Sequence, residues 1–118
     1  MELWQKGQLK MNYNITTDIK MNDKEAFKMI TNAMYELYVV KNHDYGNSFS
    51  NSFGRFGIVS AAVRIGDKFN RLASLCTSDA LVADESIEDT LLDLANYCIM
   101  TVIELEKRKT TIDERKLN

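Results

Sequence analysis

Hydrophobic residues recur at every third or fourth position in three long segments of the chain, which is the spacing of one face of an α-helix. We expect helices over residues 23–41, 58–76 and 85–109. Asn22 followed by Glu25 fits a capping box before the first helix, and Asp84 is a candidate cap for the third. The chain has no proline and only five glycines, so little interrupts these segments. The pattern predicts an all-α fold, a helical bundle of three main helices.

The segments outside these helices carry weaker patterns. Residues 1–21, where Tyr13, Ile15 and Thr17 alternate with polar residues, are expected to form an N-terminal arm that is extended or otherwise ordered. Residues 44–57 are rich in Gly, Ser and Asn and predict a loop. Its four aromatic side chains either hold it on the core or line a pocket. The domain covers residues 22–110, and the charged tail 111–118 is either frayed or a short extra helix.

The third helix separates into an apolar arc and an acidic side at 100° per residue. Asp89 and Asp93 are one turn apart, where like charges repel, so a cation or a basic partner should offset them. Glu88 lies at the edge of the apolar arc and needs a partner if it is buried. The alternative is a solvated acidic surface. The arc consists of Ile87, Leu91, Leu94, Ala95, Cys98, Ile99, Val102 and Leu105. It is too broad for one neighbouring helix, which predicts a homo-oligomer.

The second helix has basic and acidic residues on the side opposite its apolar stripe. Arg64, Asp67, Lys68 and Arg71 form either a ladder of intrahelical ion pairs or a phosphate-binding clamp. Arginine binds phosphate bidentately, and Asp67 could share a magnesium ion with the acids of the third helix. The apolar stripe consists of Ile58, Ala62, Ile65, Phe69, Leu72 and Cys76.

Composition narrows the class of protein. The 118 residues, 45% of them hydrophobic, suit one compact core. The formal net charge of −2 gives no general attraction to nucleic acid or to a membrane. No apolar run is long enough to cross a bilayer and no signal-peptide core is evident, so we expect a cytoplasmic protein. Cys76 and Cys98 are expected to be buried free thiols. His43 is more readily a helix-capping residue than a catalytic base.

Three segments in order, KNHDYGNSF, VRIGDKFNRL and ESIEDTLLDLANYCI, resemble the nucleotide modification associated domain of phage and bacterial proteins. The resemblance covers residues 36–105. That family is grouped with the MazG-like all-α nucleotide pyrophosphatases. Those enzymes cleave a nucleoside triphosphate to monophosphate and pyrophosphate with magnesium held by acids on two antiparallel helices, and they usually work as dimers or tetramers.

The signature of those enzymes is Glu-x-x-Glu on one helix and Glu-x-x-Asp on a later one. Asp93 matches the final aspartate, and Tyr97 matches the aromatic residue four positions on. Thr90 stands at the glutamate position, and on the second helix only Asp67 stands where a pair of acids is expected. Arg64, Lys68 and Arg71 add positive charge where the enzymes carry acids.

The resemblance implies a magnesium-dependent nucleotide pyrophosphohydrolase of phage nucleotide metabolism, acting in the host cytoplasm as a homo-oligomer. The expected catalytic residues are Asp67 and Asp93. The expected magnesium ligands are Asp67, Glu88, Asp89 and Asp93. The expected substrate contacts are Asp44, Tyr45, Arg64, Lys68, Arg71, Asn96 and Tyr97.

Two alternatives stay open. The first is a non-catalytic nucleotide-binding protein, which sequesters a signalling nucleotide or serves as a subunit of a DNA-base-modification complex. The second is a helical interaction module whose polar sides are simply hydrated. In none of these cases is a membrane or direct nucleic-acid binding expected.

Overall fold

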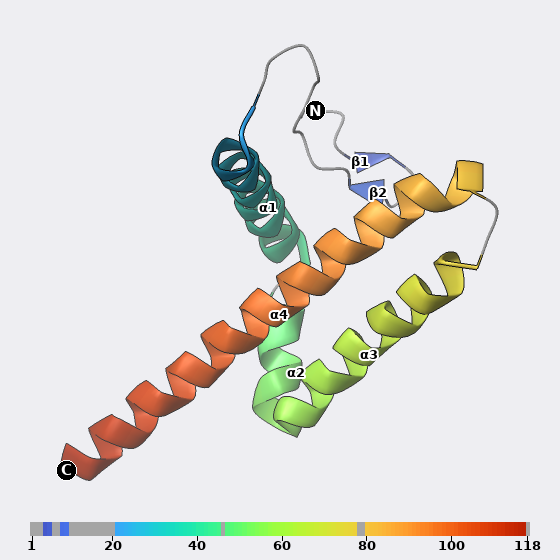
Figure 1. The fold of residues 1–118 in the computed structure, drawn as a ribbon. Coiled ribbons are helices and arrows are strands. Elements are labelled where there is room, and N and C mark those ends of the chain that lie inside the picture. The colour runs from blue at the N-terminus through green and yellow to red at the C-terminus, as the bar shows by residue number, and fades with distance from the viewer. Residues whose placement is uncertain (1–3, 6–7, 10–20, 46, 78–79, 118) are drawn as a thin grey trace. The chain divides into compact units, whose positions relative to one another are not determined.

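The computed structural model describes the backbone of residues 4–5, 8–9, 21–45, 47–77 and 80–117, and the side chains of residues 21–42, 47–77 and 87–111. The described elements are strands β1 (Trp4–Gln5) and β2 (Gln8–Leu9) and helices α1 (Asp23–Tyr45), α2 (Ser48–Phe56), α3 (Ile58–Leu75) and α4 (Ala80–Leu117) (Figure 1). They fall into two compact units, Met1–Gly46 and Asn47–Asn118. The all-α fold is therefore confirmed. The division into an arm, a domain and a tail stays a prediction.

The first unit contains the two short strands and α1. The strands pair antiparallel, with Trp4 opposite Leu9. The predicted alternation at residues 13–17 lies outside the described residues. The capping box is confirmed, because the backbone N–H of Glu25 donates to Asn22 Oδ1 at 2.8 Å and Asn22 Nδ2 donates to Glu25 Oε1 at 3.1 Å. The helix runs past the predicted end at residue 41 to Tyr45, immediately before Gly46.

In the second unit, the predicted loop over residues 44–57 is wrong, because most of it forms α2. Phe49 and Phe53, one helical turn apart, are both buried there. Their burial outweighs the low helix propensity of the surrounding Ser, Asn and Gly residues, because tertiary packing supplies most of the stability of a short helix. Asn47 (φ 66°) precedes α2 and Gly57 (φ 75°) follows it, and both adopt positive φ values that end regular helix.

The small core of the second unit lies where α2 meets α3 and α4. Phe49, Phe53 and Ala61 are its buried members, and Tyr97 and Met100 of α4 pack against them. The two aromatic residues therefore hold this segment on the core, which was one of the two roles predicted for them. Phe56, the third phenylalanine of the segment, is exposed.

Helix α4 is longer than predicted at both ends. It begins at Ala80, so Asp84 lies inside the helix and is not its cap, and it continues to Leu117, so the predicted tail is helical. Helices α3 and α4 lie side by side and antiparallel (Figure 1). Only part of the predicted apolar surfaces is covered, since Ile65, Leu72 and Leu94 are partly buried. Thr90 and Thr101 are the buried residues of the described part of α4, whereas Leu91, Val102 and others of the apolar arc are exposed.

Both cysteines are free, as predicted, but the expectation that they are buried is wrong. Cys76 and Cys98 are exposed, because each lies on the part of its apolar stripe that no element of this unit covers. Several large apolar side chains share that exposure, among them Ile58 and Phe69 of α3.

A partly buried ionic cluster joins α2 to α4. Ser50 Oγ donates to Glu104 Oε2 at 2.7 Å, and Lys107 Nζ donates to the same oxygen at 2.9 Å and to Ser50 Oγ at 3.2 Å. Burial of the Glu104 side chain, which is 12% exposed, acts to raise the pKa of its carboxyl. The hydrogen bonds from Ser50 and Lys107 and the charge of Lys107 outweigh it and hold the pKa below its ordinary value of 4.5.

We predict that Phe53→Ala destabilises the protein by about 3–5 kcal/mol, because it removes a ring that is 2% exposed and leaves a cavity between the helices. The matched change Phe56→Ala, at a ring that is 64% exposed, should cost less than about 1 kcal/mol. Urea unfolding followed by circular dichroism measures both. Equal losses for the two variants would show that α2 is not held by Phe53.

We also predict a dependence of stability on pH that comes from Glu104. Because its pKa is lower in the folded state, its stabilisation is present above the ordinary pKa of 4.5 and is lost as the pH falls through the lower, folded value. Glu104→Gln should cost about 1–2 kcal/mol at pH 7 and should flatten the decline in unfolding free energy between pH 5 and about pH 3. Glu106→Gln, two positions along at an exposed carboxylate, is the control and should leave the decline unchanged. An identical pH profile for Glu104→Gln and the wild type would contradict this assignment.

Candidate functional site

The facing sides of α3 and α4 bring two of the predicted site residues together. Lys68 Nζ donates to Asp93 Oδ2 at 2.9 Å, and both side chains are partly buried. Thr90, one turn before Asp93, is 2% exposed. The sequence resemblance predicted a glutamate at this position, and the contact instead holds a buried hydroxyl beside a lysine–aspartate pair.

Arg64 lies one turn before Lys68 and is held by α2. Its guanidinium carbon lies 5.3 Å from the centroid of the Phe49 ring, and its Nη2 donates to Ser52 Oγ at 3.1 Å. The Phe49 ring in turn stacks on Tyr97, with centroids 5.9 Å apart and planes inclined by 19°. A cation over an aromatic face gains electrostatic attraction. Phe49 therefore links two predicted substrate contacts, Arg64 and Tyr97, on different helices.

Sequence reasoning missed the roles of Phe49 and Ser52. A loop, as predicted for residues 44–57, gives its side chains no fixed direction. The available signal was the spacing of Phe49 and Phe53, which fits one helical face. Ser52 lies on the same helix, within reach of Arg64.

The remaining predicted residues of α3 and α4 lie nearer to solvent. Asp67 and Arg71 are exposed on α3, Glu88 and Asp89 are exposed on α4, and Asn96 is partly buried. Glu88 and Asp89 both take part in interactions, so neither is an isolated charge. Glu88 is therefore not the buried carboxylate that its place beside the apolar arc allowed.

Asp44 and Tyr45 form the end of α1 in the other unit, and their side chains lie outside the described residues. Their predicted contact with a nucleotide base stays a prediction. The same holds for His43 as a helix-capping residue.

The acids predicted as magnesium ligands do not form a cluster in one copy of the chain. Among the described residues, no three His, Cys, Asp or Glu side chains lie close enough together to hold a metal ion. One oxygen of Asp93 already accepts a hydrogen bond from the ammonium of Lys68. In this arrangement the described carboxylates do not fit a magnesium ion held by the protein alone.

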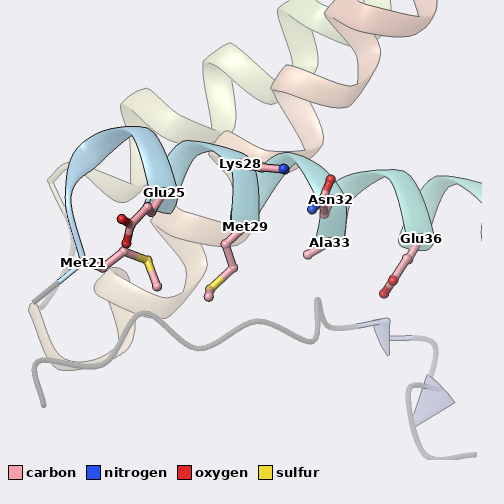
Figure 2. Close-up of a pocket in the computed structure, with 7 residues that line it drawn as sticks. All are labelled: Met21, Glu25, Lys28, Met29, Asn32, Ala33 and Glu36. Atoms are coloured by element: carbon pink, nitrogen blue, oxygen red, sulfur yellow. The ribbon is translucent and has the colours of Figure 1, made fainter. Parts of the chain in front are cut away.

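A shallow depression of about 400 Å³ runs along α1 (Figure 2). It is lined by Met21, Glu25, Lys28, Met29, Asn32, Ala33 and Glu36. None of these is a predicted site residue. Methionine side chains and charges of both signs alternate along it, so no single ligand chemistry converges there.

No helix in the described part of the chain has the length and apolarity that a membrane crossing needs.

Comparison with known proteins gives one family that covers α2, α3 and part of α4. Comparison with curated proteins and with solved structures gives no match. The family described as nucleotide modification associated domain 1 matches residues 41–105, more than half of the chain, and this range includes α2, α3 and the Lys68–Asp93 pair. The chain therefore belongs to the nucleotide modification associated domain 1 family.

Proposed function

We propose that the protein binds a nucleotide and that the basic side of α3 contacts its phosphate groups. The observation that carries this proposal is the ion pair of Lys68 with Asp93 in place of a cluster of acids. A lysine held at a helix–helix contact provides a fixed positive charge for a phosphate oxygen. The family of the chain is described by its association with nucleotide modification, which fits such a ligand.

The setting of Arg64 supports the same ligand. Phe49 and Ser52 hold the guanidinium in one orientation, so less side-chain entropy is lost when it binds a phosphate. Arg71, exposed one turn beyond Lys68, adds a third positive charge along the same helix. Three basic residues on successive turns match the length of a di- or triphosphate better than that of a single phosphate.

Hydrolysis of a nucleoside triphosphate to monophosphate and pyrophosphate is the second candidate. It is favoured by Asp89 and Asp93, which are one turn apart on α4, and Asp93 pairs with Lys68. The resemblance to MazG-like enzymes also supports it, with Asp67 and Glu88 as further acids. Because the described carboxylates do not gather into a metal site, a magnesium ion would have to arrive with the phosphates of the nucleotide. We therefore place nucleotide binding first.

The biological setting is part of the proposal. The resemblance and the composition support a cytoplasmic location, a role in phage nucleotide metabolism and a homo-oligomeric state. Sequestration of a signalling nucleotide and membership of a DNA-base-modification complex are the two settings in which binding without turnover is useful.

We predict that a nucleoside triphosphate from a panel of ribo- and deoxynucleotides binds the wild-type protein in EDTA, measured by calorimetric titration. Lys68→Ala should weaken binding about 10- to 100-fold, because it removes a charge-assisted hydrogen bond. Asp93→Asn should leave binding unchanged or tighten it, because it releases Lys68 for the phosphate. Lys109→Ala is the matched control, since Lys109 also pairs with a carboxylate, Glu106 at 3.0 Å, but lies near the far end of α4.

The same panel separates the two candidates. Intact nucleotide recovered after incubation with Mg²⁺ supports binding alone. Hydrolysis is supported if the wild type releases monophosphate and pyrophosphate and the Asp93→Ala variant does not. The proposal would be contradicted if no nucleotide changed the melting temperature of the protein. It would also be contradicted if Lys68→Ala bound the nucleotide with the affinity of the wild type.

A further inference from the structure

Two arginines of the second unit lie on phenylalanine rings at the turn between α2 and α3. The guanidinium carbon of Arg55 is 5.4 Å from the centroid of the Phe56 ring, and that of Arg108, on α4, is 4.8 Å from the centroid of the Phe53 ring. A Cβ built at Gly57, the residue after Phe56, would lie 3.4 Å from Arg108 Nη2. Both guanidinium groups therefore border the same turn, although they come from helices that are far apart in the sequence.

Neither arginine forms an ion pair with a carboxylate of the described residues. The two acids nearest to Arg108 in the sequence, Glu104 and Glu106, already pair with lysines at 2.9 and 3.0 Å. Arg55 and the segment 104–109 together carry four basic and two acidic residues, a formal net charge of +2. The net charge of −2 for the whole chain hides this local excess. The expectation against nucleic-acid binding rested on that net charge, so it does not extend to this surface.

Contact with a ring orients a guanidinium group without using its hydrogen bonds. The ring attracts the cation through its π electrons, and the five N–H donors of the group stay available. A planar fork of this kind binds two phosphate oxygens at once, and less side-chain entropy is lost because the group is already oriented. Arg55 and Arg108 are both exposed, so an anion from solution can reach them.

The ring of Phe56 gives this surface a second property, because it is 64% exposed. It is not part of the core cluster that Phe53 helps to form. A phosphate group needs only the two arginines, whereas an exposed ring beside them is what a nucleic-acid base stacks on. The bases of a single strand are free to stack on a protein ring, but the bases of a duplex stack on one another.

We propose that the turn between α2 and α3 binds single-stranded nucleic acid, with a base stacked on Phe56 and neighbouring phosphates held by Arg55 and Arg108. The first unit of the chain does not complement this surface in charge. Its described side chains, residues 21–42, include three acidic and three basic residues, so they offer no excess of negative charge. The surface uses none of the residues proposed to bind a nucleotide, and the proposal is independent of that function.

The test is the fluorescence anisotropy of a labelled strand of about 12 thymidine nucleotides, titrated with the full chain in EDTA. We expect a dissociation constant of roughly 10–100 µM at about 50 mM salt, in the range of non-specific binding. Two phosphate contacts give a slope of about −1.4 in a plot of the logarithm of the association constant against that of the salt concentration, and Arg55→Ala should halve it to about −0.7. Phe56→Ala should weaken binding at least about fivefold with an unchanged slope, because it removes stacking and no charge.

Phe27→Ala is the matched control for the ring, since Phe27 is 71% exposed on α1 in the other unit. It should leave the affinity and the slope unchanged. The proposal would be overturned if the full chain did not bind the strand, or if Phe27→Ala and Phe56→Ala lost the same affinity.

Three further outcomes would assign the binding elsewhere and would also overturn the proposal. Displacement of the strand by poly-glutamate of equal charge would indicate an acidic protein partner. Tighter binding of a matched duplex, unaffected by Phe56→Ala, would indicate that only the phosphates are recognised. Loss of binding in Lys68→Ala but not in Phe56→Ala would place the strand at the proposed nucleotide site. Because strand binding is tested at Phe56 and nucleotide binding at Lys68, each proposal can fail while the other stands.

Discussion

The contact between α3 and α4, where Lys68 pairs with Asp93 at 2.9 Å, is the constraint on which the rest of the second unit depends. Two amphipathic helices would ordinarily pack through their apolar arcs and leave their charges in water. Here the side of α4 that turns inward also carries the polar groups of Asp93, Thr90 and Thr101. The cost of burying these groups is offset by hydrogen bonds, such as the one from Thr101 to the carbonyl of Tyr97 at 2.6 Å. One consequence is that much of the apolar arc of α4 is left uncovered.

The way in which α3 and α4 face each other gives this pair of helices two different surfaces. On one side α2 adds Phe49 and Ser52, which fix Arg64 beside the Lys68–Asp93 pair. Elsewhere on the same two helices, large apolar side chains such as Phe69 and Val102 are exposed. The polar side is therefore the ordered candidate for recognition within this unit.

Helical periodicity was enough to predict the all-α class and the central parts of three helices. Residue types alone predicted the capping box at Asn22 and Glu25. Periodicity was not enough for α2, because Ser, Asn and Gly at that segment have low propensity and only the packing of Phe49 and Phe53 decides its structure. Periodicity also identifies an apolar arc without showing what covers it. Cys76 and Cys98 were expected to be buried and are exposed, because the elements that cover an apolar arc are decided by tertiary packing.

The candidate site could likewise be predicted in part from the sequence. Lys68, Arg64, Asp93 and Tyr97 could be selected from residue type and helical side, and the structure brings Lys68 to Asp93 and links Arg64 to Tyr97 through Phe49. The pairing of an acid with a base, instead of acid with acid, depends on the rotation of each helix about its axis, which a single sequence does not specify.

The most direct test of the account is a crystal structure with a non-hydrolysable nucleoside triphosphate. The account predicts phosphate oxygens within hydrogen-bonding distance of Lys68 Nζ and of the Arg64 guanidinium, with positions 68 and 93 still facing each other across α3 and α4. Phosphates bound elsewhere, or helices rotated so that Lys68 and Asp93 lie on separate surfaces, would contradict it.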